Sequence, residues 1–430
     1  MKMKILWTTN SLVGDAGELL LNKKIKSGGW MTPFLEGLKE QSNIELVIVT
    51  SSDTKKVLFA KKDNVSYYIL PGGHPIAKYE AGKKRNIEIW KDCLAREKPD
   101  VIHIWGIESS IGRAALTACD CKIPAIIYMQ GVADALDRYC EAGISRYDQK
   151  RMATLRDYLR FDTIWLQHKK YQKMIENERW LIRNAKNVIV ENRWCYMHCK
   201  NSYNDVNAYY LPLSINKVFF EVKRENFDKY TITCPLSYAP LKGLHVLYKA
   251  LAIVKEKYPQ VKLKMPGNKK IVKGLKDRLL QDGYSKYLDE LARIGNIQDN
   301  IEYMGILSAE EMAQNMSKAH VFVMCSSIEN HSSTLKEAMA VGLPCITSDV
   351  GGVMEYVDHK QSGLIYRFEE YELLAQYIID CFENDDLCNK LALNARQQQL
   401  RMSQAQNTIL PIIDIYRDLL GREENDGSEK

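Results

Sequence analysis

The chain has 430 residues, is 46% hydrophobic and carries a formal net charge of +6 at pH 7. This length is enough for two domains with separate cores, and so modest a charge argues against a nucleic-acid-binding protein while permitting contact with anionic lipid or phosphorylated acceptors. No apolar run approaches the roughly 20 residues of a membrane span, and the N-terminus predicts a strand rather than a signal peptide. The scattered cysteines predict reduced thiols in a cytosolic protein.

The first half predicts strands that alternate with helices. The expected strands cover residues 4–9, 44–50, 65–70, 101–105, 123–129, 187–191 and 209–213, and the expected helices include 31–39, 86–97 and 110–118. Such alternation predicts a doubly wound parallel sheet. We therefore expect a Rossmann-like N-terminal domain over residues 1–213, with His103 as a core residue of its strand.

Two loops of this domain are candidates for ligand contact. Gly28 and Gly29 precede a helix, where free amides and a close backbone approach suit an anion, although a plain tight turn is the simpler explanation. Gln130 ends the strand 123–129 at the carboxyl edge of the sheet. Glutamine donates to a sugar hydroxyl or a phosphate but does not titrate near neutrality, so this position cannot be a general base.

Residues 142–186 are basic and aromatic, and two explanations are open. Arginines and lysines interleave with Tyr158, Phe161, Trp165, Tyr171 and Trp180. The segment is either a pair of surface helices whose aromatic side chains face the core, or a surface for a membrane, a lipid-linked acceptor or a carbohydrate acceptor.

Two short clusters in the sequence combine cysteine with other metal-binding residue types. They are Cys119-Asp120-Cys121, and Cys195 with His198 and Cys199. Neither has a second pair at zinc-finger spacing, so no metal site is predicted.

The second half predicts another alternating domain, over residues 214–405. Its expected strands cover 231–237, 262–267, 301–305, 321–324 and 363–366, with one more ending near Ser348. A helix is expected over 406–420, and the polar, charged residues 421–430 predict a disordered tail.

Lys242 and Gly243 introduce a helix whose apolar face includes Leu244, Leu247 and Leu251. A lysine at a helix N-terminus opposes the helix dipole. This placement favours an anion such as a phosphate beside Lys242 over a solvated surface lysine.

The stretch 325–354 reads CSSIENHSSTLKEAMAVGLPCITSDVGGVM and opens a helix near Ser333 and Thr334, with Glu337 expected in its first turn. The amides of such a helix suit a phosphate, and the carboxylates of Glu329 and Glu337 suit the hydroxyls of a sugar or ribose. Thr334 and Glu337 also have capping-box spacing, which would give Glu337 a purely local role.

Glu329, seven intervening residues and Glu337, followed by Ala338-Met339-Ala340 and Gly342-Leu343-Pro344, resemble the signature of the retaining glycosyltransferases of family 4. The resemblance is strongest over residues 230–370. It implies the α/β GT-B fold, with two Rossmann-like doubly wound parallel-sheet domains facing a central cleft. It also implies that the helix 406–420 packs back on the N-terminal domain.

The same resemblance implies a role for each site residue. Glu329 would contact donor-sugar hydroxyls, Glu337 the ribose, and Lys242 the departing diphosphate. Further donor contacts would come from Asn330, Ser333, Thr334, Leu335, Ser237, Gly243 and Ile306, while Gly28, Gly29 and Gln130 would line the donor and acceptor cleft. The chain departs from the family pattern twice, because Gln130 stands where many members have histidine and Ser237 where members have arginine.

These observations predict a hexosyltransferase that uses a UDP- or GDP-sugar and retains the anomeric configuration. The acceptor would be a glycan or lipid-linked molecule, in bacterial surface polysaccharide synthesis. Because no suitable Asp-x-Asp pair is present, we expect no metal and no cofactor beyond the nucleotide-sugar co-substrate. We expect a cytoplasmic protein with possible peripheral contact at the inner face of the membrane and no nucleic-acid partner.

Two alternatives remain. The missing arginine and histidine suit a catalytically silent subunit that binds a nucleotide sugar. A GT-B enzyme that is not a transferase, such as an epimerase or a phosphorylase, is the other.

Overall fold

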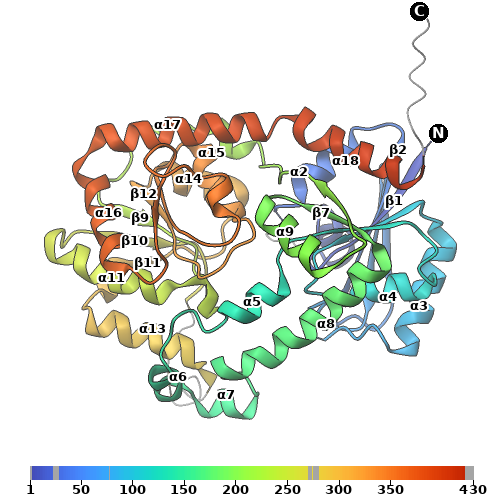
Figure 1. The fold of residues 1–430 in the computed structure, drawn as a ribbon, viewed down its shortest axis with the longest axis horizontal. Helices are drawn as coiled ribbons and strands as arrows, with labels where there is room; N and C mark the ends of the chain where they lie inside the picture. The colour runs from blue at the N-terminus through green and yellow to red at the C-terminus, as the bar shows by residue number, and fades with distance from the viewer. Residues whose placement is uncertain (1, 23–28, 77, 270–273, 275–279, 422–430) are drawn as a thin grey trace, which may run out of the picture. The chain divides into compact units, whose positions relative to one another are not determined.

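The computed structural model describes residues 2–22, 29–76, 78–269, 274 and 280–421 (Figure 1). Residue contacts divide the chain into two compact units. The first comprises Met1–Ala133, Lys173–Ser214 and Met402–Lys430, and the second comprises Asp134–Gln172 and Ile215–Arg401. Each unit has its own sheet.

Within the described residues, the first unit contains an eight-stranded sheet in the order β3-β4-β2-β1-β5-β6-β7-β8. Its pairings are parallel except for the antiparallel pair β3 and β4. The strands are β1 (Met3–Thr8), β2 (Ile44–Ser52), β3 (Leu58–Lys62), β4 (Val65–Pro71), β5 (Val101–Trp105), β6 (Ala125–Tyr128), β7 (Asn187–Val190) and β8 (Asn207–Tyr210). The doubly wound parallel sheet is therefore confirmed, and β3 is an edge strand that was not predicted.

Helices of the first unit are α1 (Ala16–Leu21), α2 (Thr32–Lys39), α3 (Lys84–Glu97), α4 (Ile111–Ala118), α9 (Arg193–Ser202), α18 (Ala405–Leu419) and most of α8 (Gln167–Ala185). The C-terminal helix α18 packs into the core of this unit. Its Tyr416 hydroxyl lies 3.2 Å from Trp7 Nε1 and 2.7 Å from His103 Nδ1. His103 is fully buried, as expected, and burial lowers its pKa to about 3.

Residues 134–172 pack with the second unit, so the expected N-terminal domain over 1–213 is interrupted. This segment forms the end of α5 (Ala133–Tyr139), then α6 (Arg146–Met152), α7 (Leu155–Leu159), a 3-10 turn (Ile164–Leu166) and the start of α8. His245 Nε2 lies 3.0 Å from the Ala142 carbonyl oxygen, and the Gly283 amide donates to the buried Asp157 carboxylate at 2.8 Å. Partners more than a hundred residues away decide this placement, and no local pattern shows them.

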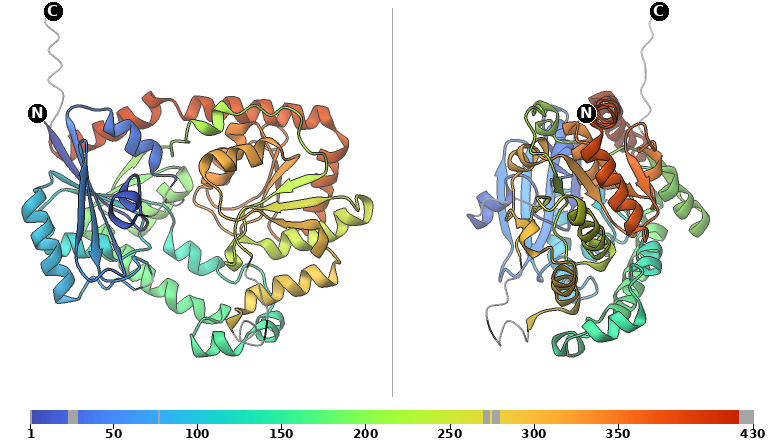
Figure 2. Two further views of the ribbon diagram at one scale, coloured as in Figure 1. Left: turned by 180° about the vertical axis from the view of Figure 1, so that it is seen from behind. Right: turned by 90° about the vertical axis from the view of Figure 1, so that its left-hand side faces the viewer.

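The second unit contains, over the described residues, a six-stranded sheet in the order β11-β10-β9-β12-β13-β14 with parallel pairings. Its strands are β9 (Thr231–Thr233), β10 (Lys262–Met265), β11 (Ile301–Tyr303), β12 (Val321–Met324), β13 (Cys345–Ser348) and β14 (Leu364–Tyr366). Its larger helices are α11 (Leu244–Lys257), α13 (Gly283–Ile294), α14 (Ala309–Ser317), α15 (Ser333–Val341), α16 (Tyr371–Glu383) and α17 (Asp385–Met402). Helices cover both faces of this sheet (Figure 2).

Candidate functional site

Two loops of the second unit are joined at the carboxyl ends of β9 and β12. The Ser327 amide donates to the Leu241 carbonyl at 2.7 Å, and the Cys325 thiol donates to the Lys242 carbonyl at 3.2 Å. The loop after β12 therefore lies against the turn Pro240–Lys242 that precedes α11. In parallel sheets, ligands bind at this edge.

Two glycines permit this close approach. Gly243 has φ 67°, and an added Cβ would overlap the carbonyl oxygen of Cys325. Gly351 has φ 55°, and an added Cβ would overlap the carbonyl oxygen of Glu329. Since other residues rarely adopt such angles and have no room here, both glycines fix the backbone beside Lys242 and Glu329.

Lys242 and Glu329 form an ion pair. Lys242 Nζ lies 2.6 Å from Glu329 Oε1, which also accepts a hydrogen bond from Ser326 Oγ at 2.7 Å. The lysine side chain is 46% exposed and the glutamate side chain 10% exposed. The anion expected beside Lys242 is therefore a carboxylate in this structure.

A cavity of about 110 Å³ adjoins the ion pair. It is lined by Lys242 and Glu329 together with Ser237, Ser332 and Thr334. Ser237 is held in a local turn, because its hydroxyl accepts the Ala239 amide at 3.2 Å. The structure thus brings four predicted site residues, Ser237, Lys242, Glu329 and Thr334, around one space.

The helix α15 begins at Ser333, and its cap is Ser332 rather than Thr334. Ser332 Oγ accepts the Leu335 amide at 3.3 Å. The capping-box explanation of Glu337 is therefore wrong, and Glu337 lies beyond the first turn. The amides of Ser333 and Thr334 find no acceptor in the described part of the chain, whereas the Leu335 amide is already bonded.

Glu337 is a half-buried carboxyl group to which none of the described residues donates a hydrogen bond. Burial raises its pKa to about 7. A carboxyl group in this state suits a hydroxyl-bearing ligand, which would supply the missing donors.

The remaining predicted donor residues lie in the same unit. Asn330 is buried next to Glu329. Ile306 follows β11 and is 58% exposed, outside the residues that line the cavity. Its neighbour Gly305 exchanges two backbone hydrogen bonds with Gly267, at 2.7 and 3.1 Å.

The first unit carries a separate polar cluster after β1, β5 and β6. Asn10 Nδ2 donates to Glu108 Oε2 and to Gln130 Oε1, at 3.5 Å in each case. Asn10 Oδ1 and Gln130 Nε2 are buried and have no hydrogen-bond partner among the residues that the structure describes. Asn10 and Glu108 were not predicted, although both follow the ends of neighbouring strands, which is the signal that identifies Gln130.

The glycine pair remains a prediction. Gly28 lies outside the described residues. Gly29 precedes α2, and an added Cβ would meet open space there, so packing does not require glycine at this position.

Comparison with known proteins connects the second unit to a family. Residues 216–398 match the family model described as Glycosyl transferases group 1. The D-inositol 3-phosphate glycosyltransferase of Corynebacterium urealyticum is 30% identical over 179 residues, which cover 42% of this chain and 41% of that protein. The N-acetyl-alpha-D-glucosaminyl L-malate synthase of Bacillus anthracis is 24% identical over 136 residues, covering 32% of this chain and 35% of that protein. These matches span about two fifths or less of the relatives' length.

Solved structures match over nearly the whole chain. Sucrose-phosphate synthase from Thermosynechococcus elongatus superimposes with a TM-score of 0.73 at 18% identity, over 98% of this chain and 100% of that chain. Anabaena Alr3699/HepE in complex with UDP and glucose superimposes with a TM-score of 0.64 at 15% identity, over 98% of this chain and 100% of that chain. The chain therefore has the GT-B fold, and its residues 216–398 match the glycosyl transferases group 1 family.

Proposed function

We propose that the protein is a retaining glycosyltransferase that transfers a hexose-type sugar from a UDP- or GDP-sugar to a glycan or lipid-linked acceptor in bacterial surface polysaccharide synthesis. The observation that carries this proposal is the Lys242–Glu329 pair, held at 2.6 Å beside a cavity at the N-terminus of α15. The family match over residues 216–398 supports it.

Donor binding would rearrange the ion pair. The donor diphosphate would attract Lys242 and the free amides of Ser333 and Thr334, because a helix N-terminus and an ammonium group both favour an anion. Released from Lys242, the Glu329 carboxylate would accept hydrogen bonds from sugar hydroxyls. One cation and two amides would then stabilise the leaving diphosphate, and Ser237 contributes no charge.

Glu337 would hold the ribose of the nucleotide. Its carboxyl group has no donor among the described residues, and a vicinal diol supplies two. Retention would follow if the leaving phosphate takes the proton of the acceptor hydroxyl on the face from which the nucleotide departs.

The polar cluster of the first unit is the proposed acceptor contact. Asn10 Oδ1 and Gln130 Nε2, to which no described residue is hydrogen-bonded, offer an acceptor and a donor to a sugar hydroxyl. Because an amide does not titrate near neutrality, Gln130 would position the acceptor and not deprotonate it.

A peripheral membrane contact is proposed at α7. Leu155, Leu159 and Phe161 are 63%, 72% and 73% exposed, whereas the acidic Asp157 on the opposite face of α7 is buried. This arrangement is the reverse of an ordinary surface helix. Tyr158 is also exposed, so the aromatic side chains of this segment do not all face the core.

The charge around α7 favours an anionic bilayer. Residues 145–173 contain eight arginines and lysines and three aspartates, a net +5 against +6 for the whole chain. Exposed apolar side chains flanked by cations are typical of proteins that lie on anionic lipid. No helix of the described residues is long and apolar enough to cross a membrane.

The membrane contact is tested by sedimentation with vesicles. We expect the protein to bind vesicles of phosphatidylcholine with phosphatidylglycerol and not vesicles of phosphatidylcholine alone. Phe161→Glu should abolish binding, and Leu393→Glu, at an exposed apolar site on α17, should not. Equal binding by both variants would refute the assignment to α7.

The transferase activity is tested by a donor screen. Purified protein is mixed with UDP-, GDP-, ADP- and CMP-sugars, with and without EDTA, and both thermal stabilisation and slow donor hydrolysis are measured. One donor that stabilises and is hydrolysed, with hydrolysis lost in Glu329→Ala, is the expected result. Stabilisation without hydrolysis or transfer would favour the silent subunit, and no response to any donor would refute the site.

Analysis of the products distinguishes a transferase from the other alternative, an epimerase or a phosphorylase. A transferase that slowly transfers the donor sugar to water releases free sugar and the nucleoside diphosphate. An epimerase would change the donor sugar without releasing it, and a phosphorylase would require inorganic phosphate and form a sugar 1-phosphate.

A further inference from the structure

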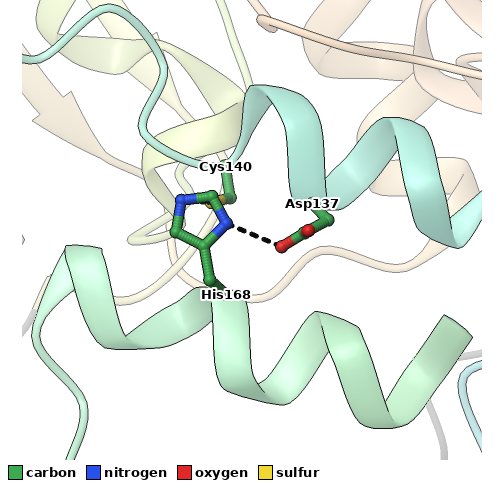
Figure 3. A group of neighbouring side chains, drawn as sticks. All are labelled: Asp137, Cys140 and His168. Atoms are coloured by element: carbon green, nitrogen blue, oxygen red, sulfur yellow. Dashed lines mark hydrogen bonds and ion pairs between the residues drawn. The ribbon is translucent and has the colours of Figure 1, made fainter.

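Three side chains that bind metals in proteins converge outside the donor site (Figure 3). Asp137 lies in α5, Cys140 follows the end of that helix, and His168 lies in the first turn of α8. One donor atom from each lies within 4.8 Å of the others. His168 Nδ1 is 2.7 Å from Asp137 Oδ1. Cys140 Sγ lies at nearly the same distance from both ring nitrogens of His168, 3.6 Å from Nδ1 and 3.5 Å from Nε2.

Neighbouring side chains form hydrogen bonds with the second oxygen of Asp137 and the second ring nitrogen of His168. Gln172 Nε2 donates to Asp137 Oδ2 at 2.9 Å, which leaves Oδ1 directed at the histidine. His168 Nε2 lies 3.3 Å from Glu141 Oε1, which also accepts from Arg146 at 2.7 Å. Metal-binding histidines and carboxylates are oriented in this way by outer hydrogen bonds.

The separations are close to those of a tetrahedral site. With metal–sulfur bonds of about 2.3 Å and metal–nitrogen bonds of about 2.1 Å, tetrahedral ligand atoms lie roughly 3.4–3.7 Å apart. The sulfur–nitrogen separation already meets this value. The shorter separation between Asp137 and His168 is that of a hydrogen bond, whose proton a metal ion would replace.

The combination of groups also indicates the kind of ion. Thiolate, imidazole and carboxylate together are ligands of zinc-type cations rather than of calcium or magnesium. Cys140 is completely buried, so the same three residues cannot act as a nucleophilic site toward an external substrate. His168 is 39% exposed, which leaves room for water as a fourth ligand.

We propose that Asp137, Cys140 and His168 bind one zinc-type divalent cation. Bound there, the cation would join the end of α5 to the start of α8 and close the segment that contains α6 and α7. It would also fix the chain next to the donor site, because the Tyr139 carbonyl accepts a hydrogen bond from Ser327 Oγ at 3.2 Å. The ion would be structural and is separate from the proposed sugar transfer.

The test is titration of tag-free, metal-depleted protein with Co²⁺, accompanied by elemental analysis of zinc in protein purified without chelators. We expect one ion per chain, a thiolate-to-cobalt charge-transfer band and the intense visible bands of tetrahedral cobalt. Cys140→Ser should remove the charge-transfer band. Gln172→Leu, which removes only an outer hydrogen bond, should weaken binding by about 10–100-fold.

A matched control is Cys121→Ser, because Cys121 is a free thiol beside Asp120 in a cluster without a histidine. It should leave every cobalt band unchanged. Circular dichroism of each variant confirms folding. The proposal is refuted if the wild-type protein shows no band, if the band survives Cys140→Ser, or if nuclear magnetic resonance shows a His168 imidazolium between the two carboxylates that excess Zn²⁺ does not displace.

Discussion

Replacing Glu337 by glutamine should stabilise the protein in a pH-dependent way. Burial raises the pKa of Glu337 from 4.5 to about 7. A carboxyl group with a raised pKa in the folded state favours folding while it is protonated. Its contribution is complete below pH 4.5, declines as the pH rises and is lost above pH 7, where the ionised group is half-buried and none of the described residues donates to it.

The size of the effect follows from the two pKa values. At about 1.36 kcal/mol for each pH unit, the rise to about 7 corresponds to roughly 3 kcal/mol. Between pH 5 and pH 8 we expect the advantage of Glu337→Gln over the wild type to grow by about 2–3 kcal/mol. At about 2–4 °C per kcal/mol for a domain of this size, the Tm difference should reach several degrees.

Thermal unfolding of both proteins from pH 5 to pH 8 measures this difference. Glu256→Gln, at an exposed position in the last turn of α11, is the control and should show little change. The stabilised variant should bind UDP or GDP more weakly, because a glutamine side chain has only one oxygen to accept from a ribose diol. A Tm difference that does not vary with pH, or a Glu337→Gln protein less stable than the wild type at pH 8, would refute the reasoning.

Three further predictions follow from single contacts. Lys242→Ala should reduce donor hydrolysis about 100–1000-fold. It should change stability by less than about 1 kcal/mol, because the lysine side chain is 46% exposed and Ser326 still donates to Glu329. Equal hydrolysis by variant and wild type would contradict the role of Lys242. Gly243→Ala should lower the midpoint of urea unfolding by the equivalent of several kcal/mol, because Gly243 has φ 67° and an added Cβ would overlap the Cys325 carbonyl oxygen. An unchanged midpoint would show that the turn Pro240–Lys242 relaxes to accept the methyl group. Tyr416→Phe should lower the free energy of unfolding, measured in urea, by about 1–3 kcal/mol, because the buried Trp7 Nε1 and His103 Nδ1 lose their hydrogen-bond partner. A decrease below about 0.5 kcal/mol would show that water replaces the hydroxyl group.

Local pattern predicted the strands well where they are buried. The strands 101–105 and 321–324 appear with the expected bounds because each is a short apolar run that its neighbours cover on both faces. The edge strand β3 was missed, since its residues are partly or fully exposed and lysine-rich and carry no continuous apolar signal.

The start of α15 is set by a contact that the sequence does not reveal. Ser332 and Thr334 are both good caps, and the sequence does not distinguish them. In the structure the Ser332 hydroxyl reaches the Leu335 amide, which moves Glu337 out of the first turn. The capping alternative fails for this geometric reason.

The sequence by itself determined the two alternating α/β halves and the Glu329 to Glu337 motif, because both depend on periodicity and spacing within one stretch of chain. Only the tertiary structure decided the partners of the charged groups. Lys242 pairs with Glu329, which is 87 residues away in the sequence, and His168 pairs with Asp137, which is 31 residues away. Side-chain contacts of this kind depend on which strands lie side by side and which turns pack together, and those contacts leave no local pattern in the sequence.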